Sequence, residues 1–191
     1  MLTVLVIDES RARAGEICAG LALAGYQVAA ILAGADNLTA EVERLQPDVI
    51  LIDTDSPSRD TLENLAAMSS ASPRPVVVFA EDPSHEPMQQ ALKAGVSAYV
   101  IAGLQPQRLM PVLQVAIARF EQDRALREQL GEAQTQLSER KLIERAKGVL
   151  MDDIGLTEEQ AYKHLRKMAM DRGQRLGQVA ERVVQAKKLL G

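Results

Sequence analysis

Acidic side chains follow two of the short apolar runs in the first half of this 191-residue chain. Asp8 and Glu9 come directly after the run 2–7, and Asp53 follows the run 49–52. Clustered carboxylates form a hard oxygen site of the kind that suits Mg²⁺, and one of them can instead accept a phosphoryl group. The residues therefore predict an acidic pocket of Asp8 and Glu9 beside Asp53, with a weak Mg²⁺ site as its only candidate cofactor.

Short strands that alternate with helices must position these carboxylates. Runs rich in Val and Ile occur five times, at 2–7, 26–32, 49–52, 76–80 and 98–102. The segments between them have helical spacing, and this alternation is typical of a parallel sheet covered on both faces. The pattern predicts a five-stranded doubly wound α/β domain over 1–119, with the pocket at the carboxyl ends of its strands.

The stretch 105–138 predicts a helix that links two domains. Its apolar residues recur in steps of three and four, at Leu109, Leu113, Ala116, Phe120, Leu130 and Leu137. The same register places polar side chains on the seam, so the heptad pattern is imperfect. We interpret it as a coiled coil that makes the protein a homodimer. The alternative is an amphipathic helix that packs on its own domain.

The remainder of the chain, 136–191, predicts an all-α bundle of three helices. The first spans 142–151 and ends at Gly155. Thr157 and Gln160 form a capping box that opens the second, which ends at Gly173. The third aligns Val179, Val183, Ala186 and Leu190 on one face. The overall fold class is therefore α/β plus all-α.

Charge is distributed unevenly along the chain. The formal net charge of −4 argues against a generally basic nucleic-acid binder. However, residues 1–120 hold 14 acids and 8 bases, whereas residues 140–191 hold 12 bases and 7 acids. This contrast predicts two modules with different partners.

Several classes of protein are excluded by composition. A single cysteine, Cys18, excludes a disulfide framework and a Cys-based zinc site. The two histidines, His85 and His164, give little material for a catalytic triad, and we expect no enzymatic activity. No apolar run approaches the ~18 residues of a membrane helix, and the start of the chain lacks a charged region typical of signal peptides. We expect a cytoplasmic protein that does not contact membranes.

The first 105 residues resemble the receiver domain of bacterial response regulators. Asp8-Glu9, Asp53 and Pro57 carry the resemblance, which implies that Asp53 is equivalent to the phosphoacceptor and that Asp8 and Glu9 hold Mg²⁺.

Two positions depart from the receiver pattern. Ala80 stands where the family has Thr or Ser, and Ala102-Gly103 stand where it has Lys-Pro. An acyl phosphate carries about two negative charges and needs compensating donors. We therefore interpret the domain as a degenerate receiver that binds protein and supports dimerisation.

Residues 136–190 resemble the ANTAR domain, the RNA-binding module of the AmiR/NasR family of antitermination regulators. The resemblance rests on Ile143-x-x-Ala146-Lys147-Gly148-Val149-Leu150-Met151 and on 155–162. The order of domains looks most like the NasT type of nitrate/nitrite regulator. It implies a regulator that binds hairpins in leader mRNA and prevents terminator formation. It also implies control by a nitrate/nitrite-sensing, periplasmic-binding-like protein rather than by phosphorylation.

Basic residues and one aromatic residue are the candidate RNA contacts. The set comprises Arg145, Lys147, Tyr162, Lys163, Arg166, Lys167, Arg172 and Arg175. Cations meet phosphates with salt-dependent affinity, and Tyr162 or an arginine plane would stack on bases.

Two other functions stay open. One is a phosphorylation-controlled response regulator whose C-terminal helices bind DNA. The other is a phosphatase of the haloacid dehalogenase type, built on the aspartates of 53–56.

Overall fold

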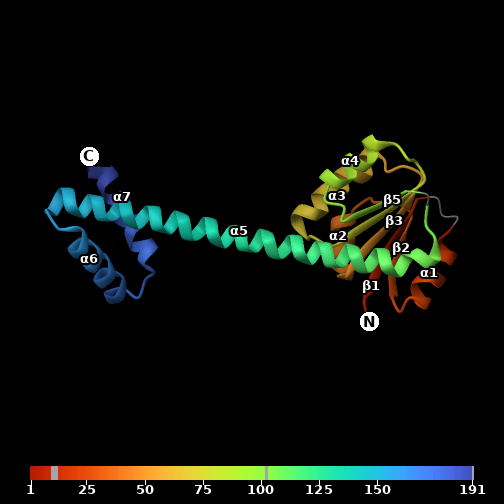
Figure 1. The fold of residues 1–191 in the computed structure, drawn as a ribbon, viewed down its shortest axis with the longest axis horizontal. Coiled ribbons are helices and arrows are strands. Elements are labelled where there is room, and N and C mark those ends of the chain that lie inside the picture. Colours follow the sequence, from red (N-terminus) through yellow and green to blue (C-terminus); the bar gives the residue numbers. More distant parts are fainter. Residues whose placement is uncertain (10–12, 102, 191) are drawn as a thin grey trace. The chain divides into compact units, whose positions relative to one another are not determined.

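The N-terminal part of the chain folds around one parallel sheet. The computed structural model describes residues 1–9, 13–101 and 103–190. Its five strands are β1 (Thr3–Asp8), β2 (Gln27–Leu32), β3 (Val49–Thr54), β4 (Val76–Ala80) and β5 (Ala98–Ile101). They pair in the order β2-β1-β3-β4-β5, which confirms the predicted doubly wound topology (Figure 1).

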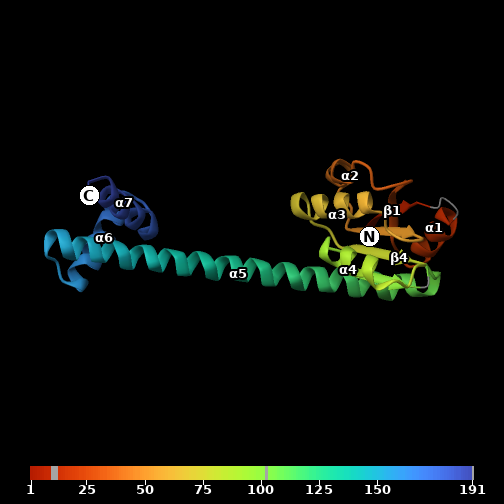
Figure 2. The same cartoon turned by 90° about the horizontal axis from the view of Figure 1, so that it is seen from above.

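Helices cover both faces of this sheet (Figure 2). They are α1 (Ala14–Leu23), α2 (Leu38–Leu45), α3 (Arg59–Ala71), α4 (His85–Lys93) and the beginning of α5 (Pro106–Ile154). One apolar cluster joins the sheet to α2, α3 and α4, and a second joins it to α1 and α5. Because the central strands lie between two apolar layers, β1 and β3 are almost wholly apolar until their last residues, and β4 is apolar throughout.

The strand register brings the acidic residues together. Asp8 at the end of β1 pairs with Asp53 in β3, and Asp53 in turn pairs with Phe79 in β4. The carboxyl ends of neighbouring parallel strands therefore meet at one edge, as the sequence predicts.

Helix α5 is a single unbroken helix of 49 residues. The expected separate helix over 142–151 is wrong as a separate element, because the helix continues to Ile154 and ends at Gly155, whose φ is +72°. Glycine adopts this left-handed conformation without the steric cost that a Cβ would bring.

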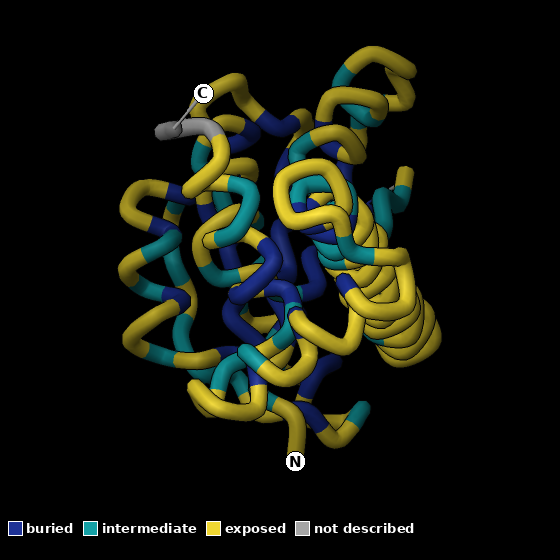
Figure 3. Tube along the Cα trace, turned by 90° about the vertical axis from the view of Figure 1, so that its left-hand side faces the viewer, coloured by how far each residue is buried: buried dark blue, intermediate teal, exposed yellow. Residues whose placement is uncertain are grey.

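The predicted dimer seam is wrong in its first half. Leu109, Leu113 and Ala116 are fully buried in the apolar cluster under the sheet, so this part of α5 packs on its own domain. In contrast, every residue from 121 to 138 is exposed, as the yellow turns of the tube illustrate (Figure 3).

The C-terminal unit is helical. The chain divides into two compact units, Met1–Arg124 and Ala125–Gly191. In the second unit, α6 (Glu158–Asp171) and α7 (Leu176–Leu190) pack on the last turns of α5. Helix α6 begins at the predicted capping box of Thr157 and Gln160. No helix in the described part of the chain is long and apolar enough to cross a membrane.

Candidate functional sites

The pocket at the strand ends contains a cation supplied by the chain. Asp53 is fully buried, and Asp8 is nearly so. The Arg13 guanidinium lies between two acids, with Nε 3.0 Å from Asp53 Oδ2 and Nη1 3.0 Å from Glu81 Oε1. Neither oxygen of Asp53 accepts a hydrogen bond of good geometry from the described residues, so its contact with Arg13 is essentially one of charge.

Glu9 is held by two hydroxyl groups. Thr54 Oγ1 donates to Glu9 Oε2 at 2.6 Å, and Thr61 Oγ1 donates to Glu9 Oε1 at 2.7 Å. Thr61 stands in the first turn of α3, whose N-cap is Ser58. Both oxygens of Glu9 are thus committed to α3 and the end of β3.

This arrangement does not fit the predicted Mg²⁺ ion. A magnesium site needs several free oxygen ligands in near-octahedral geometry. Here Arg13 lies on Asp53, and both oxygens of Glu9 accept hydrogen bonds. Among the described residues, no group of three or more His, Cys, Asp or Glu side chains is arranged to hold a metal.

Burial controls the protonation of Asp53. Loss of hydration raises the pKa of this carboxyl from 3.8 to about 6, against the opposing effect of the Arg13 charge. The charges of Asp8, Glu81 and Asp55 raise the pKa further.

The sequence reasoning missed Arg13. The available signal was an arginine five residues after Asp8, in a chain that has Ala102 where the receiver pattern has Lys. Ala80 is buried at the end of β4 and supplies no hydroxyl. Ala102 lies outside the described residues. Gly103 has a φ of +68°, and a Cβ there would lie 3.3 Å from Arg13 Nη1.

The basic side chains of the C-terminal unit differ in whether they have an ion-pair partner. Five of the predicted contacts are exposed and make no side-chain hydrogen bond or ion pair within the part of the chain that the structure describes; they are Arg145, Arg166, Lys167, Arg172 and Arg175. Lys163 is also exposed, but it pairs with Glu159 one turn away at 2.7 Å.

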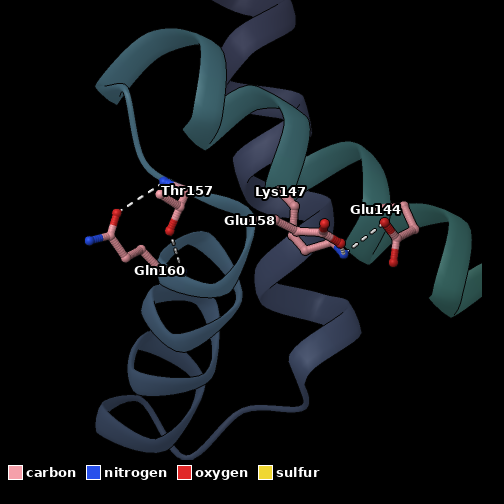
Figure 4. A network of polar contacts seen from close by, with 5 residues as sticks. All are labelled: Glu144, Lys147, Thr157, Glu158 and Gln160. Atoms are coloured by element: carbon pink, nitrogen blue, oxygen red, sulfur yellow. Dashed lines mark hydrogen bonds and ion pairs between the residues drawn. The ribbon is translucent and has the colours of Figure 1, made fainter.

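Lys147 differs from all of these because it is buried. Its side chain is only 9% exposed and its Nζ lies 2.8 Å from Glu144 and 2.7 Å from Glu158 (Figure 4). These two carboxylates, Glu144 first, raise the pKa of Lys147, while the lysine lowers the pKa of Glu158. The lysine joins α5 to the first turn of α6, which argues against the predicted phosphate contact.

Tyr162 stands on α6 one turn before the unpaired Arg166. It is 44% exposed, although Ala161 next to it is fully buried. Arg166 follows four residues later and Met170 eight residues later, so the three lie along one face of the helix. An exposed ring, a guanidinium plane and a thioether form a surface on which a flat apolar group can stack.

Both parts of the chain match family models. The model of the response regulator receiver domain matches residues 4–114, and the model of the ANTAR domain matches residues 131–184.

Two curated regulatory proteins are similar to this chain over different lengths. The transcriptional regulatory protein PdtaR of Mycobacterium tuberculosis is 30% identical over 161 residues, which cover 84% of this chain and 78% of that protein. The nitrate regulatory protein of Klebsiella oxytoca is 42% identical over 83 residues, which cover 44% of this chain and 20% of that protein.

Solved structures agree on the fold of the first unit. The signal receiver domain of a modulated diguanylate cyclase from Desulfovibrio desulfuricans G20 has a TM-score of 0.57 at 19% identity. That alignment covers 64% of this chain and 98% of the other. A CheY-like receiver domain protein from Methanospirillum hungatei JF-1 has a TM-score of 0.56 at 22% identity, with the same coverage.

Proposed function

The chain belongs to the response regulators that join a receiver domain to an ANTAR domain, and on that premise we propose that it is a transcription antitermination regulator. It binds hairpins in nascent leader mRNA and prevents formation of the terminator. The observation that carries the proposal is the set of exposed cations without an ion pair among the described residues of the C-terminal unit, together with the exposed ring of Tyr162 one turn before Arg166.

The proposed RNA surface consists of Tyr162 and the five unpaired cations named above. Cations without carboxylate partners can meet phosphates without first breaking an ion pair, so they contribute fully to salt-dependent binding. Tyr162 and Arg166 offer flat faces to unstacked loop bases, which are the usual targets of sequence-specific RNA binding. Lys147 is not part of the proposed RNA surface because its ammonium group already pairs with two carboxylates.

Binding to a leader RNA with tandem hairpins, measured against salt concentration, tests this surface. Arg166→Ala should weaken binding and reduce the salt slope by about 1. Lys187→Ala is the matched control, because Lys187 is paired with Asp153 and should leave the slope unchanged. Tighter binding to duplex DNA of the same sequence would instead favour the DNA-binding alternative.

Two copies of the chain are proposed to associate through α5. Leu126, Leu130 and Leu137 are more than half exposed and are separated by four and seven residues, with Ala133 between them. This is the spacing of a short coiled-coil seam. The stretch 121–138 is exposed throughout, so a second copy is the occupant that the heptad spacing fits.

Mass measurement of the full chain in solution tests the dimer. Leu130→Arg should shift the protein toward monomer, because a buried unpaired charge is costly at a seam. Glu132→Arg places the same residue on the opposite side of the helix and should leave the mass unchanged. A monomeric wild type at micromolar concentration would refute the proposed seam.

Control by a protein partner, rather than by phosphorylation, completes the proposal. Ala80 offers no hydroxyl to an acyl phosphate on Asp53. The Klebsiella oxytoca relative is a nitrate regulatory protein, which supports nitrate or nitrite as the signal. The proposed cytoplasmic partner, a nitrate- or nitrite-sensing, periplasmic-binding-like protein, follows from the resemblance to the NasT type alone. Capture of partners from cells grown with and without nitrate tests this, and equal capture in both would contradict it.

Asp53→Asn should keep regulation nearly intact in a reporter assay.

A further inference from the structure

We propose that Arg13 is a tethered cation that takes the place of a metal ion in the strand-end pocket and holds the pocket in one arrangement without Mg²⁺. The proposal concerns the receiver unit alone and does not depend on RNA binding.

Arg13 contacts acids from three parts of the fold. Its guanidinium bridges Asp53 at the end of β3 and Glu81 directly after β4, at 3.0 Å each. Its backbone N–H donates to Asp8 Oδ2, at the end of β1, over 3.3 Å. One residue just before α1 therefore places a positive charge between the acids at two strand ends and donates a backbone hydrogen bond to the acid at a third. A divalent cation in an acidic pocket would have the same effect.

Glu9, the third acid of the predicted pocket, does not contact the Arg13 guanidinium in the described structure and is hydrogen-bonded to hydroxyl groups instead. Glu9 accepts from Thr54 and Thr61 with both oxygens. It is thus compensated by hydroxyls and does not depend on a cation. A metal entering the pocket would have to displace these hydroxyls or meet the guanidinium, a like charge, on Asp53.

The backbone opposite Arg13 leaves room for it. The Gly103 N–H donates to the carbonyl of Ala80 at 3.0 Å, which fixes the segment after β5 close to the end of β4. A side chain at 103 would meet Arg13 Nη1 at 3.3 Å and Glu81 Oε1 at 3.6 Å, and would be strained at a φ of +68°. The absence of a side chain at Gly103 therefore leaves the space that the Arg13 guanidinium occupies.

Burial explains why the pocket needs this cation. An ionised Asp53 removed from water is costly unless it is paired. Arg13 is covalently attached next to the pocket, so its local concentration does not depend on the medium.

Hydrogen exchange of the full chain, with and without millimolar MgCl₂ at matched ionic strength, tests the proposal. Peptides from β3 and β4 report the stability of the pocket. In the wild type, Mg²⁺ should leave their exchange unchanged. Arg13→Met should speed their exchange, and Mg²⁺ should then slow it. Arg59→Met is the matched control, because Arg59 pairs with Glu63 at the surface of α3 and lies outside the pocket.

Two results would overturn the proposal. One is Mg²⁺-dependent protection of the wild type equal to that of Arg13→Met. The other is exchange in Arg13→Met no faster than in Arg59→Met. If Arg13→Met does not fold, Arg13→Met/Asp53→Asn decides: removing the charge that needs compensation should restore folding, and failure to restore it also overturns the proposal. The experiment contains no RNA, so its failure leaves the proposed function untouched.

Discussion

Acidification should stabilise the receiver unit through Asp53. The folded-state pKa of this carboxyl is about 6, above its ordinary value of 3.8, because burial disfavours the ionised form. The native state therefore takes up a proton in a pH range where the unfolded chain is still ionised. Stability from this group rises as pH falls through 6 and is lost as pH rises again.

The magnitude follows from the size of the shift. A change from 3.8 to about 6 is worth about 3 kcal/mol in total, at ~1.36 kcal/mol per pKa unit. Between about pH 8 and about pH 5, the linkage relation gives a gain of about 1.4 kcal/mol, because the unfolded carboxyl stays largely ionised at the lower limit.

Denaturant unfolding at the two pH values, in wild type and Asp53→Asn, measures this term. Other carboxyls titrate in both proteins, so the difference between them isolates Asp53. The charges of Asp8, Glu81 and Asp55 raise the pKa of Asp53, as burial does, whereas the charge of Arg13 lowers it. Wild-type protein that loses stability on acidification relative to Asp53→Asn would refute the reasoning, because the ion pair with Arg13 would then outweigh burial.

Three further predictions concern the C-terminal unit. Lys147→Met should lower the thermal stability of the C-terminal unit and weaken RNA binding, while the salt slope of binding by the folded protein stays unchanged. Thermal unfolding and binding against salt concentration measure the two effects, and a reduced slope would mean that Lys147 does contact RNA. Thr157→Ala removes an N-cap oxygen from α6 and should cost about 1 kcal/mol in denaturant unfolding. Gly177→Ala places a Cβ 2.6 Å from the Glu139 side chain, so α7 should show faster hydrogen exchange; unchanged exchange would mean that Glu139 moves aside at no cost.

The periodic parts of the fold were predictable from the sequence. The alternation of apolar runs and helical segments reports burial on both faces of the sheet, and the observed strands agree with it to within a few residues. The capping box at Thr157 was equally readable, because it depends on residues close in sequence.

Long-range packing limited the rest of the prediction. Leu109 and Leu137 share a heptad register, yet the first is fully buried under the sheet and the second is 55% exposed. Spacing alone does not tell which partner covers a helical face. The roles of Arg13 and Lys147 depend on carboxylates in other elements, Glu81 after β4 and Glu158 in α6, and the sequence pattern does not show that these lie close.

The exposed stretch of α5 has a consequence for the lifetime of the protein. Residues 121–138 form regular helix although every one of them is exposed. Helical segments of this kind open locally at low free-energy cost, and proteases cleave chains in such open states. A second copy that covers Leu126, Leu130 and Leu137 would suppress this opening. Turnover of the regulator would then slow as its concentration rises, which would couple degradation to abundance.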